Sequence, residues 1–313
     1  MKLALIYGGC GCESDVSVKG FEFVYPILRH KYDCLPVFID KNGRWLVGDK
    51  RVFPIDGGFY FIDSHAFVKV DSAFPLLHGD FGEDGIVQGT LDTAHIPYVG
   101  CDGRVGAICR DKSVVKAVAE DLGIPILPYV TLFRGDEIPN LDYPVFVKPA
   151  SLGSSIGASL ANNEQELKSS LEVAFGLCNK IIIERLLIPK RELECGYFAC
   201  KCKELFTDVG EILTDGFYDY DKKYGDFGAQ AIPCAVVDTE INSKIKDYAR
   251  RLVHRLGVRQ ICRVDFFLSG EDIYFNEINT MPGFTETSLY HMMLSEEGID
   301  ICDLLTELVG GAV

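Results

Sequence analysis

The sequence predicts a mixed α/β and α+β protein with three domains, and three observations support this fold class. The chain has 313 residues, which is more than one hydrophobic core usually spans. Apolar strand patterns alternate with helical patterns over residues 1–105, as in an open α/β sheet. Beyond that segment, short strands follow one another with few helices between them, as in α+β domains. We therefore expect an N-terminal domain over 1–105, a central domain over 106–187 and a C-terminal domain over 188–313.

The N-terminal segment reads as strands and helices in alternation. We expect strands at 2–7, 34–39 and 74–77 and helices at 14–29 and 84–94. Ligands of open α/β sheets meet the loops at the carboxyl ends of the strands. The loops in those places here are rich in Gly, Glu and His, so they are candidate binding loops.

The rest of the chain begins with a helix from Asp111 to Leu122, which Gly123 and Pro125 terminate. The central elements are expected to be strands at 128–132, 144–148, 156–160 and 181–187 and a helix at 163–176. The C-terminal elements are expected to be strands at 192–200 and 205–212, a loop at 214–234, a helix at 240–256, antiparallel strands at 262–268 and 272–278, and two final helices. A loop of this length inside a compact domain is often a lid.

The formal net charge of −15 argues against nucleic acid and anionic membrane surfaces as partners. A phosphate ligand would need a cleft made positive by local Lys and Arg. No apolar stretch reaches about 18 residues, and the N-terminal apolar run is too short for a signal peptide. No membrane segment is therefore expected, and the protein is expected to be cytoplasmic. The 12 cysteines lack zinc-binding spacing and are interpreted as reduced, small buried hydrophobes.

The strongest candidate site lies on the predicted hairpin over 262–278. Because side chains alternate along a strand, Arg263 and Asp265 share one face, and Glu277 and Asn279 share one face. If both sets face the same cleft, two carboxylates and an amide converge, a set of hard oxygen ligands suited to Mg²⁺. The alternative is a solvated hairpin face with a salt bridge.

Two central segments are candidates for nucleotide binding. Lys148 ends an apolar strand and is followed by a Gly/Ser loop over 151–157, which is typical of phosphate binding but does not have Walker A spacing. An ordinary hairpin turn remains the alternative. The apolar strand that ends at Glu184 could hold a purine, with a plain interdomain connection as the alternative.

Two further loops are candidates for binding small ligands. His78 ends a strand and is followed by a loop rich in glycine and acidic residues. Capping of the next helix by Glu83 or Asp84 is the safer interpretation of that loop. Gly283 and the helix that begins near Ser288 offer N–H donors for a carboxylate or an oxyanion.

Together and in this order, the motifs resemble those of the D-alanine–D-alanine ligase family of ATP-grasp enzymes. The strings that carry the resemblance are Gly8-Gly9 with Glu13 and Val16-Ser17, His78-Gly79 with Gly82 to Gly85, Asp111-Lys112, Val147 to Pro149 with Gly153 to Ser155, Arg191-Glu192, Lys223-Tyr224, Arg263 to Phe266, and Asn276 to Thr280 with Pro282-Gly283. The resemblance implies a three-domain ATP-grasp fold. Its parts would be a pre-ATP-grasp, substrate-binding domain (1–105), a lid domain (106–187) and a catalytic domain (188–313) with a metal site and a mobile loop (214–234).

The resemblance also implies an activity. ATP would phosphorylate the carboxylate of one D-alanine, and the amine of a second would attack the acyl phosphate. The products would be ADP, phosphate and the D-alanyl-D-alanine dipeptide used in peptidoglycan. Two Mg²⁺ ions, for which Mn²⁺ can substitute, two D-alanine subsites and a homodimer are expected on the same basis.

The resemblance assigns roles to individual residues. The expected catalytic residues are Glu13, Ser154 and Tyr224, which link to close the lid, and Arg263 and the Gly283 N–H, which stabilise the acyl phosphate and the oxyanion. The expected amino-acid ligands are Glu13 and His78 at the first subsite and Ser288 and Leu289 at the second. The expected ATP ligands are Lys112, Lys148, Lys223 and Ser155 at the phosphates, Glu184, Arg185 and Leu187 at the adenine, and Glu192 at the ribose. The expected metal ligands are Asp265, Glu277 and Asn279.

Four departures from the family pattern stand out: Gly11 and Ser14 in the first loop, a longer linker at 188–190, a short lid between Tyr224 and Pro233, and His291. D-Serine stays open as the second substrate, although Leu289 resembles the ligases that use D-alanine and Tyr224 differs from the lactate-type enzymes. Another ATP-grasp carboxylate–amine ligase is a further alternative. A nucleotide sensor or a metal-binding protein is disfavoured because the residues of the candidate metal site are intact.

Overall fold

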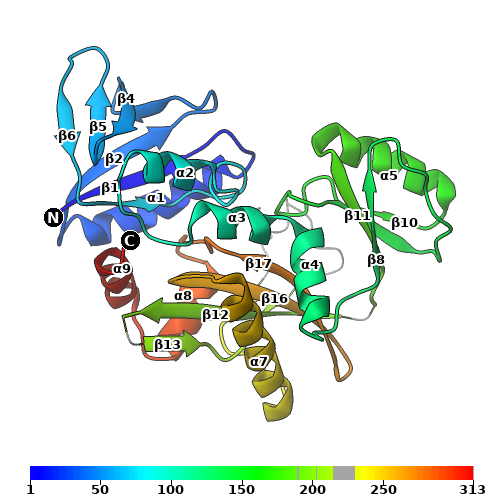
Figure 1. The fold of residues 1–313 in the computed structure, drawn as a ribbon. Coiled ribbons are helices and arrows are strands. Elements are labelled where there is room, and N and C mark those ends of the chain that lie inside the picture. The colour runs from blue at the N-terminus through cyan, green and yellow to red at the C-terminus, as the bar shows by residue number, and fades with distance from the viewer. Residues whose placement is uncertain (189, 202, 214–229, 313) are drawn as a thin grey trace.

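The computed structural model describes residues 1–188, 190–201, 203–213 and 230–312. These residues form three β-sheets. In Figure 1 the N-terminal sheet lies at the left, the central sheet at the right, and the C-terminal sheet between and below them. The sheets fall on either side of positions 105 and 187, and the domain boundaries there stay a prediction. None of the helices in the described ranges combines the length and hydrophobicity needed to cross a bilayer.

The N-terminal sheet is built around a largely buried strand. β1 (Lys2–Gly8) pairs in parallel with β2 (Asp33–Ile39) and β7 (Ser72–Pro75), with α1 (Ser14–Leu28) and α2 (Ile86–Thr93) as its helices. These elements confirm the predicted strands and helices. The sequence prediction did not include the antiparallel extension of this sheet, β3 (Trp45–Val47), β4 (Lys50–Ile55), β5 (Gly58–Phe61) and β6 (Phe67–Lys69). These strands are short and mixed in burial, so they show no period-two pattern.

Two helices with a single non-helical residue between them lead to the central sheet. α3 (Gly103–Arg110) ends and α4 (Lys112–Asp121) begins at Asp111, whose backbone is extended (φ −86°, ψ 102°). The Asp111 carboxylate accepts from the N–H groups of Ser113 and Val114, which caps α4. The predicted helix from Asp111 is confirmed, whereas α3, a helix of only eight residues, was not predicted from the sequence.

The central sheet is antiparallel, in the order β10-β9-β11-β8. Its elements are β8 (Tyr129–Phe133), β9 (Val145–Pro149), β10 (Ser159–Ala161), α5 (Glu164–Leu177) and β11 (Lys180–Arg185). The predicted strand at 156–160 begins only at 159. The preceding loop takes left-handed backbone at Ser154 (φ 51°), Ser155 (φ 57°) and Gly157 (φ 72°), which a strand cannot accommodate.

The C-terminal sheet is organised around its longest strand. Its elements are β12 (Arg191–Cys200), β13 (Lys203–Phe206), β14 (Gly210–Leu213), β15 (Gln230–Ile232), β16 (Ile261–Ser269) and β17 (Asp272–Asn279), with helices α7 (Thr239–Leu256), α8 (Leu289–Glu296) and α9 (Ile301–Gly310). The single strand predicted at 205–212 is interrupted, because Thr207 bonds Gly196 of β12 through its hydroxyl and its main chain. Most of the loop predicted at 214–234 lies outside the described residues.

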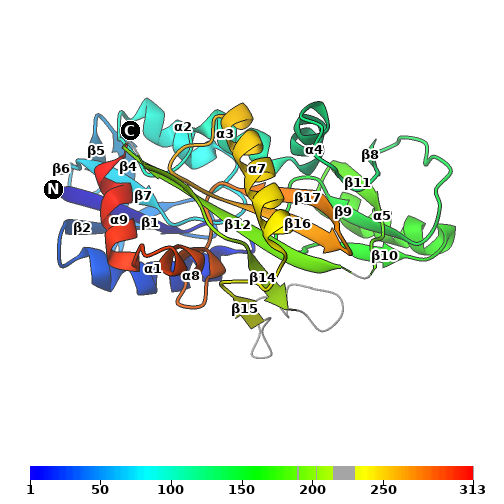
Figure 2. The ribbon, with the colours of Figure 1, turned by 90° about the horizontal axis from the view of Figure 1, so that it is seen from below.

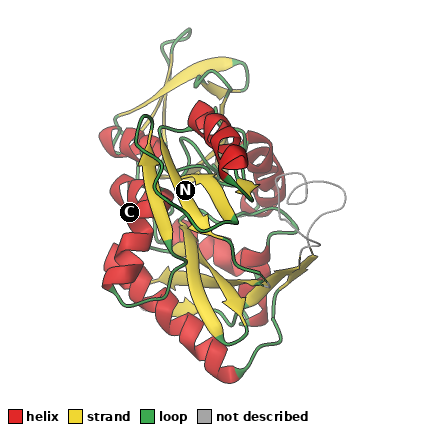
Figure 3. Ribbon diagram, turned by 90° about the vertical axis from the view of Figure 1, so that its right-hand side faces the viewer, coloured by secondary structure: helices red, strands yellow, loops and turns green. Residues whose placement is uncertain are grey.

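The helices cover both faces of the C-terminal sheet. Figure 2 shows α7 above the long strands and α8 below them. The largest core cluster joins α3, α4 and α7 to one face, and a second cluster joins α8 and α9 to α1 and the N-terminal sheet. Figure 3 shows helices beside the strands in the lower part of the view, whereas strands of the N-terminal sheet project at the top. Five of the described cysteines are buried as predicted, but Cys12, Cys234 and Cys302 are exposed.

Candidate active site

The β16–β17 hairpin presents one polar face. Its register pairs Arg263 with Asn279 and Asp265 with Glu277. Both oxygens of the Asp265 carboxylate accept from Arg263, each over 2.7 Å, and Oδ2 also accepts from the Asn279 amide over 3.0 Å. The Arg263 and Asp265 side chains are each only 13% exposed. The polar set predicted from strand alternation is therefore confirmed, and the alternative of a solvated hairpin face is excluded.

Arg263 has a second carboxylate partner on the neighbouring strand. Glu194 of β12 lies opposite Asp265, and its Oε2 is 3.1 Å from the Arg263 Nε. Burial alone would lower the pKa of Arg263, but the carboxylates of Asp265 and Glu194 raise that pKa well above its usual range. The guanidinium is thus permanently charged and held from two strands. Glu194 was not among the site residues predicted from the sequence.

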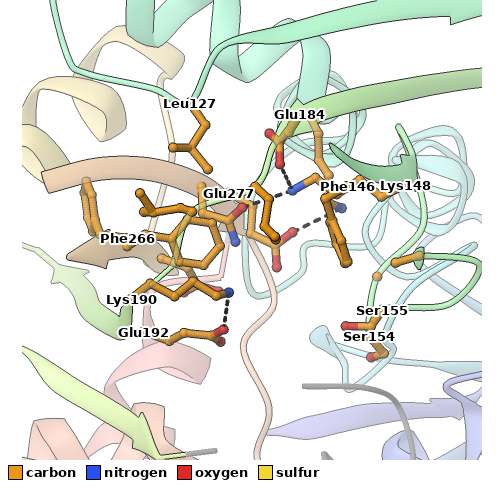
Figure 4. A pocket seen from close by; sticks show the side chains of 18 of the residues that line it. Leu127, Phe146, Lys148, Ser154, Ser155, Glu184, Lys190, Glu192, Phe266 and Glu277 are labelled. Atoms are coloured by element: carbon orange, nitrogen blue, oxygen red, sulfur yellow. Dashed lines mark hydrogen bonds and ion pairs between the residues drawn. The ribbon is translucent and has the colours of Figure 1, made fainter. Parts of the chain in front are cut away.

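A buried carboxylate links two lysines beside the hairpin. Glu184 of β11 is 2.6 Å from the Lys116 ammonium through Oε1 and 2.6 Å from the Lys148 ammonium through Oε2. Lys148 also donates to Asn276 Oδ1 over 3.2 Å, which joins β9 to β17. Burial would raise the pKa of Glu184, but the two ammonium groups lower it to about 2. Figure 4 shows Lys148 and Glu184 pointing toward one another at the back of a cavity.

This first cavity has a volume of about 410 Å³. Its apolar walls are Leu127, Phe146 and Phe266, and its polar side includes Ser154, Ser155 and Glu192 (Figure 4). Lys112 also lines this cavity. Lys112 donates to the Leu152 carbonyl over 2.7 Å and lies 3.1 Å from the Glu277 carboxylate. Glu192 pairs with Lys190 over 2.5 Å, and Arg185 and Leu187 also line the cavity. The cavity therefore has an apolar slot next to a group of lysines.

A second cavity of about 850 Å³ adjoins the first. One end contains Glu13, His78, Glu83 and Arg110, and the other end contains Gly283, Ser288 and Leu289. The two cavities share Gly153, Ser154, Glu194, Arg263 and Glu277. The two cavities therefore meet at the polar face of the hairpin.

At the first end of this cavity, the Ser154 hydroxyl donates to Glu13 Oε1. This hydrogen bond is one of those that the predicted link between Glu13, Ser154 and Tyr224 requires, and the link itself stays a prediction. Tyr224 and Lys223 lie outside the described residues. Asp84 accepts from the N–H groups of Phe81 and Ile86, but the N-cap residue of α2 is Gly85, so neither Asp84 nor Glu83 occupies the N-cap position.

At the other end of the cavity, Ser288 precedes α8 and its hydroxyl accepts from the Thr285 N–H over 2.9 Å. A Cβ at Gly283 would lie 2.8 Å from that hydroxyl, so the loop is tight. His291 Nε2 donates to the Thr285 carbonyl over 2.8 Å, and its ring stacks on Phe23 of α1 at 5.4 Å between centroids. His291 therefore ties this loop to α1.

The chain is similar to known families and structures. The family model described as "D-ala D-ala ligase C-terminus" matches residues 118–310, and the one described as "D-ala D-ala ligase N-terminus" matches residues 59–101. The chain belongs to the D-alanine–D-alanine ligase family. A D-alanine–D-alanine ligase of Solibacter usitatus is 38% identical over 99% of this chain and 94% of its own length. D-alanine–D-alanine ligase A of Escherichia coli K12 is 33% identical with the same two coverages.

Solved structures of ligases have the same fold as this member of the D-alanine–D-alanine ligase family. The VanG D-Ala:D-Ser ligase of Enterococcus faecalis superposes with a TM-score of 0.89 and 32% identity, covering 100% of this chain and 99% of its own. The D-alanyl-alanine synthetase A of Vibrio cholerae gives a TM-score of 0.89 at 27% identity, covering 100% and 98%. The expected ATP-grasp fold is confirmed by this likeness.

In this D-alanine–D-alanine ligase family member, the described residues predicted to form a site line the two cavities. Asn279, Ser288 and Leu289 line the second cavity, and Arg185, Leu187 and Glu192 line the first. Arg110, Lys116 and Glu194 were not among the residues predicted to form a site, and Glu83 was predicted only as a helix cap. Each of these charged side chains is buried against a partner far along the chain. For Lys116 a signal was present, since it lies on the same helix as the buried Val115 and Ala119.

Proposed function

We propose that this protein is an ATP-dependent ligase that joins two molecules of D-alanine through an acyl phosphate. The observation that supports this proposal is the shared wall of the two cavities. Arg263 and Glu277 line both cavities. The first cavity contains the apolar slot and the lysines, and the second contains Glu13 and Ser288. A nucleotide in the first and an amino acid in the second would bring a γ-phosphate next to a carboxylate, as phosphoryl transfer requires.

The first cavity is proposed to bind ATP. Leu127, Phe146 and Phe266 provide apolar surface for the adenine. The residues proposed to bind the phosphates are Lys112, Lys148, Ser155 and Lys223. Glu192 is proposed to bind the ribose. Because the Glu184 carboxylate already pairs with two lysines, we propose that Glu184 acts by holding Lys148, while Arg185 and Leu187 bind the adenine.

The polar face of the hairpin is proposed to hold Mg²⁺. Asp265, Glu277 and Asn279 supply oxygen donors of the kind that Mg²⁺ binds, and Mn²⁺ accepts the same ligands. Among the described residues no three His, Cys, Asp or Glu side chains lie close enough to form a metal site, so the amide of Asn279 is needed as the third ligand. Two ions bound here would neutralise charge on the transferring phosphoryl group.

The second cavity is proposed to bind both amino acids. Glu13, with His78 beside it, would bind the ammonium of the first D-alanine. Arg263 and the Gly283 N–H would stabilise the acyl phosphate and the tetrahedral oxyanion. Ser288 and Leu289 would receive the carboxylate of the second D-alanine, and Tyr224 would complete the link through Ser154 to Glu13.

D-Serine is the second candidate for the second substrate, because a D-Ala:D-Ser ligase is among the similar structures. We favour D-alanine because Leu289, which lines the cavity beside Ser288, is apolar and 5% exposed. We also propose that the enzyme is a cytoplasmic homodimer that serves peptidoglycan synthesis, with light scattering of the purified protein as the test of its oligomeric state.

Phosphate release from ATP and Mg²⁺ tests the proposed function. D-Alanine would be supplied alone and then together with D-serine or D-lactate, and the products would be identified by mass spectrometry. We expect phosphate release with D-alanine alone and the D-alanyl-D-alanine mass. The absence of phosphate release with D-alanine in every combination would overturn the proposed function, and a D-alanyl-D-serine product in excess would reassign the second substrate.

A further inference from the structure

A buried arginine lies in the wall of the amino-acid cavity. Arg110 is the last residue of α3, and its side chain is 9% exposed. Its Nη1 lies 2.8 Å from Glu83 Oε2, while its Nη2 lies 3.7 Å from Glu13 Oε2 and 3.7 Å from Asp80 Oδ1. One guanidinium therefore faces three carboxylates, one from the loop before α1 and two from the loop between β7 and α2.

These contacts fix the position of the Glu13 carboxylate. Oε1 accepts from the Ser154 hydroxyl, and Oε2 lies beside Arg110. The 3.7 Å separation is an ion-pair distance, longer than a hydrogen bond, so the Oε2 lone pairs stay available to another donor. Arg110 thus attracts the Glu13 carboxylate, while Glu13 Oε2 can still accept a hydrogen bond from another donor.

The surrounding backbone leaves little freedom to either side chain. A Cβ at Gly79 would lie 2.2 Å from Glu13 Oε2, and a Cβ at Gly153 would lie 3.1 Å from Arg110 Nη1. The glycines of these two loops make room for the Glu13–Arg110 pair. Glu83, which His78 approaches to 3.9 Å, holds the far side of the guanidinium.

We propose that Arg110 is a positioning residue for the first D-amino acid, which it serves by orienting the Glu13 carboxylate toward the substrate ammonium. The inference rests on the proposed function, in which Glu13 binds that ammonium. Without the guanidinium, the carboxylates of Glu13, Asp80 and Glu83 would repel one another, and Glu13 would lose its fixed orientation. Positioning of this kind acts on the first substrate and leaves the second subsite unchanged.

A purely structural role for Arg110 makes a different prediction. If Arg110 served only to neutralise the buried Glu83, removal of both charges together would restore the enzyme. The informative variants are therefore Arg110→Met, the double variant Arg110→Met/Glu83→Gln, and Arg110→Lys, which keeps the charge but loses the fork geometry. Arg104→Met is the matched control, because Arg104 lies on the same helix with a side chain that is 91% exposed.

The experiment measures kcat and the separate KM values for the first and second D-alanine in the phosphate-release assay. For Arg110→Met we expect the first-site KM to rise by about tenfold, the scale of a modest loss of positioning, while the second-site KM changes by less than about twofold. The double variant is expected to keep the raised first-site KM. In Arg110→Lys the first-site KM should rise less than in Arg110→Met. Arg104→Met should have the first-site KM of the wild type.

The opposite results would overturn the inference. A wild-type first-site KM in the double variant would assign Arg110 a structural role only, and equal rises of both KM values would exclude a specific effect on the first subsite. If Arg110→Met does not fold, an unchanged first-site KM in Arg110→Lys would equally refute the inference. Absent phosphate release by the wild type would overturn the proposed function and this inference with it, whereas an active wild type with an unchanged first-site KM in the variants overturns the inference alone.

Discussion

The buried set of Lys116, Glu184 and Lys148 predicts an unequal response to substitution of its members. One carboxylate lies between two ammonium groups, at 2.6 Å from each. Removing the negative charge with Glu184→Gln leaves two buried cations without a counter-ion. Removing one positive charge with Lys116→Met leaves the Glu184–Lys148 ion pair intact. Glu184→Gln is therefore expected to destabilise the protein far more than Lys116→Met.

The magnitude follows from the pKa of Glu184. A carboxyl with an ordinary pKa of 4.5 that titrates at about 2 in the folded protein contributes about 3 kcal/mol to the free energy of unfolding at neutral pH. Loss of one partner from a buried ion pair typically costs about 3–5 kcal/mol, which agrees with that value. For Lys116→Met we expect less than about 1.5 kcal/mol, because burial and Lys148 already lower the pKa of this ammonium.

Urea unfolding followed by circular dichroism would measure both variants and their combination. Because the folded pKa of Glu184 is depressed, its contribution is fully present above pH 4.5 and is lost as the pH falls toward 2. The difference between wild type and Glu184→Gln should therefore narrow when the measurement is repeated at about pH 3.5. Equal destabilisation by the two single variants, or a loss below about 1 kcal/mol for Glu184→Gln, would refute this reasoning.

Three other predictions concern the two cavities. Glu277→Gln should lose ligation by at least about a hundredfold while its melting temperature stays near that of the wild type, since it removes a proposed Mg²⁺ ligand; wild-type turnover would contradict the metal assignment. Gly79→Ala should raise the first-site KM by at least about tenfold, because its Cβ would lie 2.2 Å from Glu13 Oε2, and it should lower stability by about 1 kcal/mol because φ is +66°; an unchanged KM would show that Glu13 can move away freely. Burial lowers the pKa of His291 from 6.5, so the protein should lose stability as the pH falls below 6.5. The His291→Gln variant should lose less stability over the same range. If the melting temperatures of wild type and variant changed equally between pH 7.5 and about 5.5, the result would contradict this effect.

Patterns within one segment could be predicted from the sequence. The alternation of Arg263, Val264 and Asp265 was sufficient to predict the polar face of the β16–β17 hairpin, because strand geometry has a fixed period of two. The helices and strands of the N-terminal sheet were predicted from apolar runs and helical patterns, which are also local signals. The strands between 45 and 69 were missed because their stability comes from pairing with one another and with β2 rather than from a local pattern.

Charged contacts between distant segments could not be predicted. Arg110 meets Glu13 and Asp80, and Lys116 meets Glu184, only after the chain has folded. Burial of an arginine or a lysine runs against the usual preference of these residues for solvent. For Glu184 the sequence indicated a residue of the nucleotide site but not that its carboxylate would be occupied by two lysines.

The junction between α3 and α4 has a consequence for how this chain can vary. Three consecutive residues serve three places: Arg110 lines the second cavity, Asp111 pairs with Lys180 of the central sheet over 2.8 Å, and Lys112 lines the first cavity. One added helical residue would turn the following side chains by about 100°. Insertions that surface loops tolerate would here move one cavity relative to the other. The spacing between the two proposed substrates is therefore set by chain connectivity. We expect that insertion or deletion of a single residue at this junction would change that spacing.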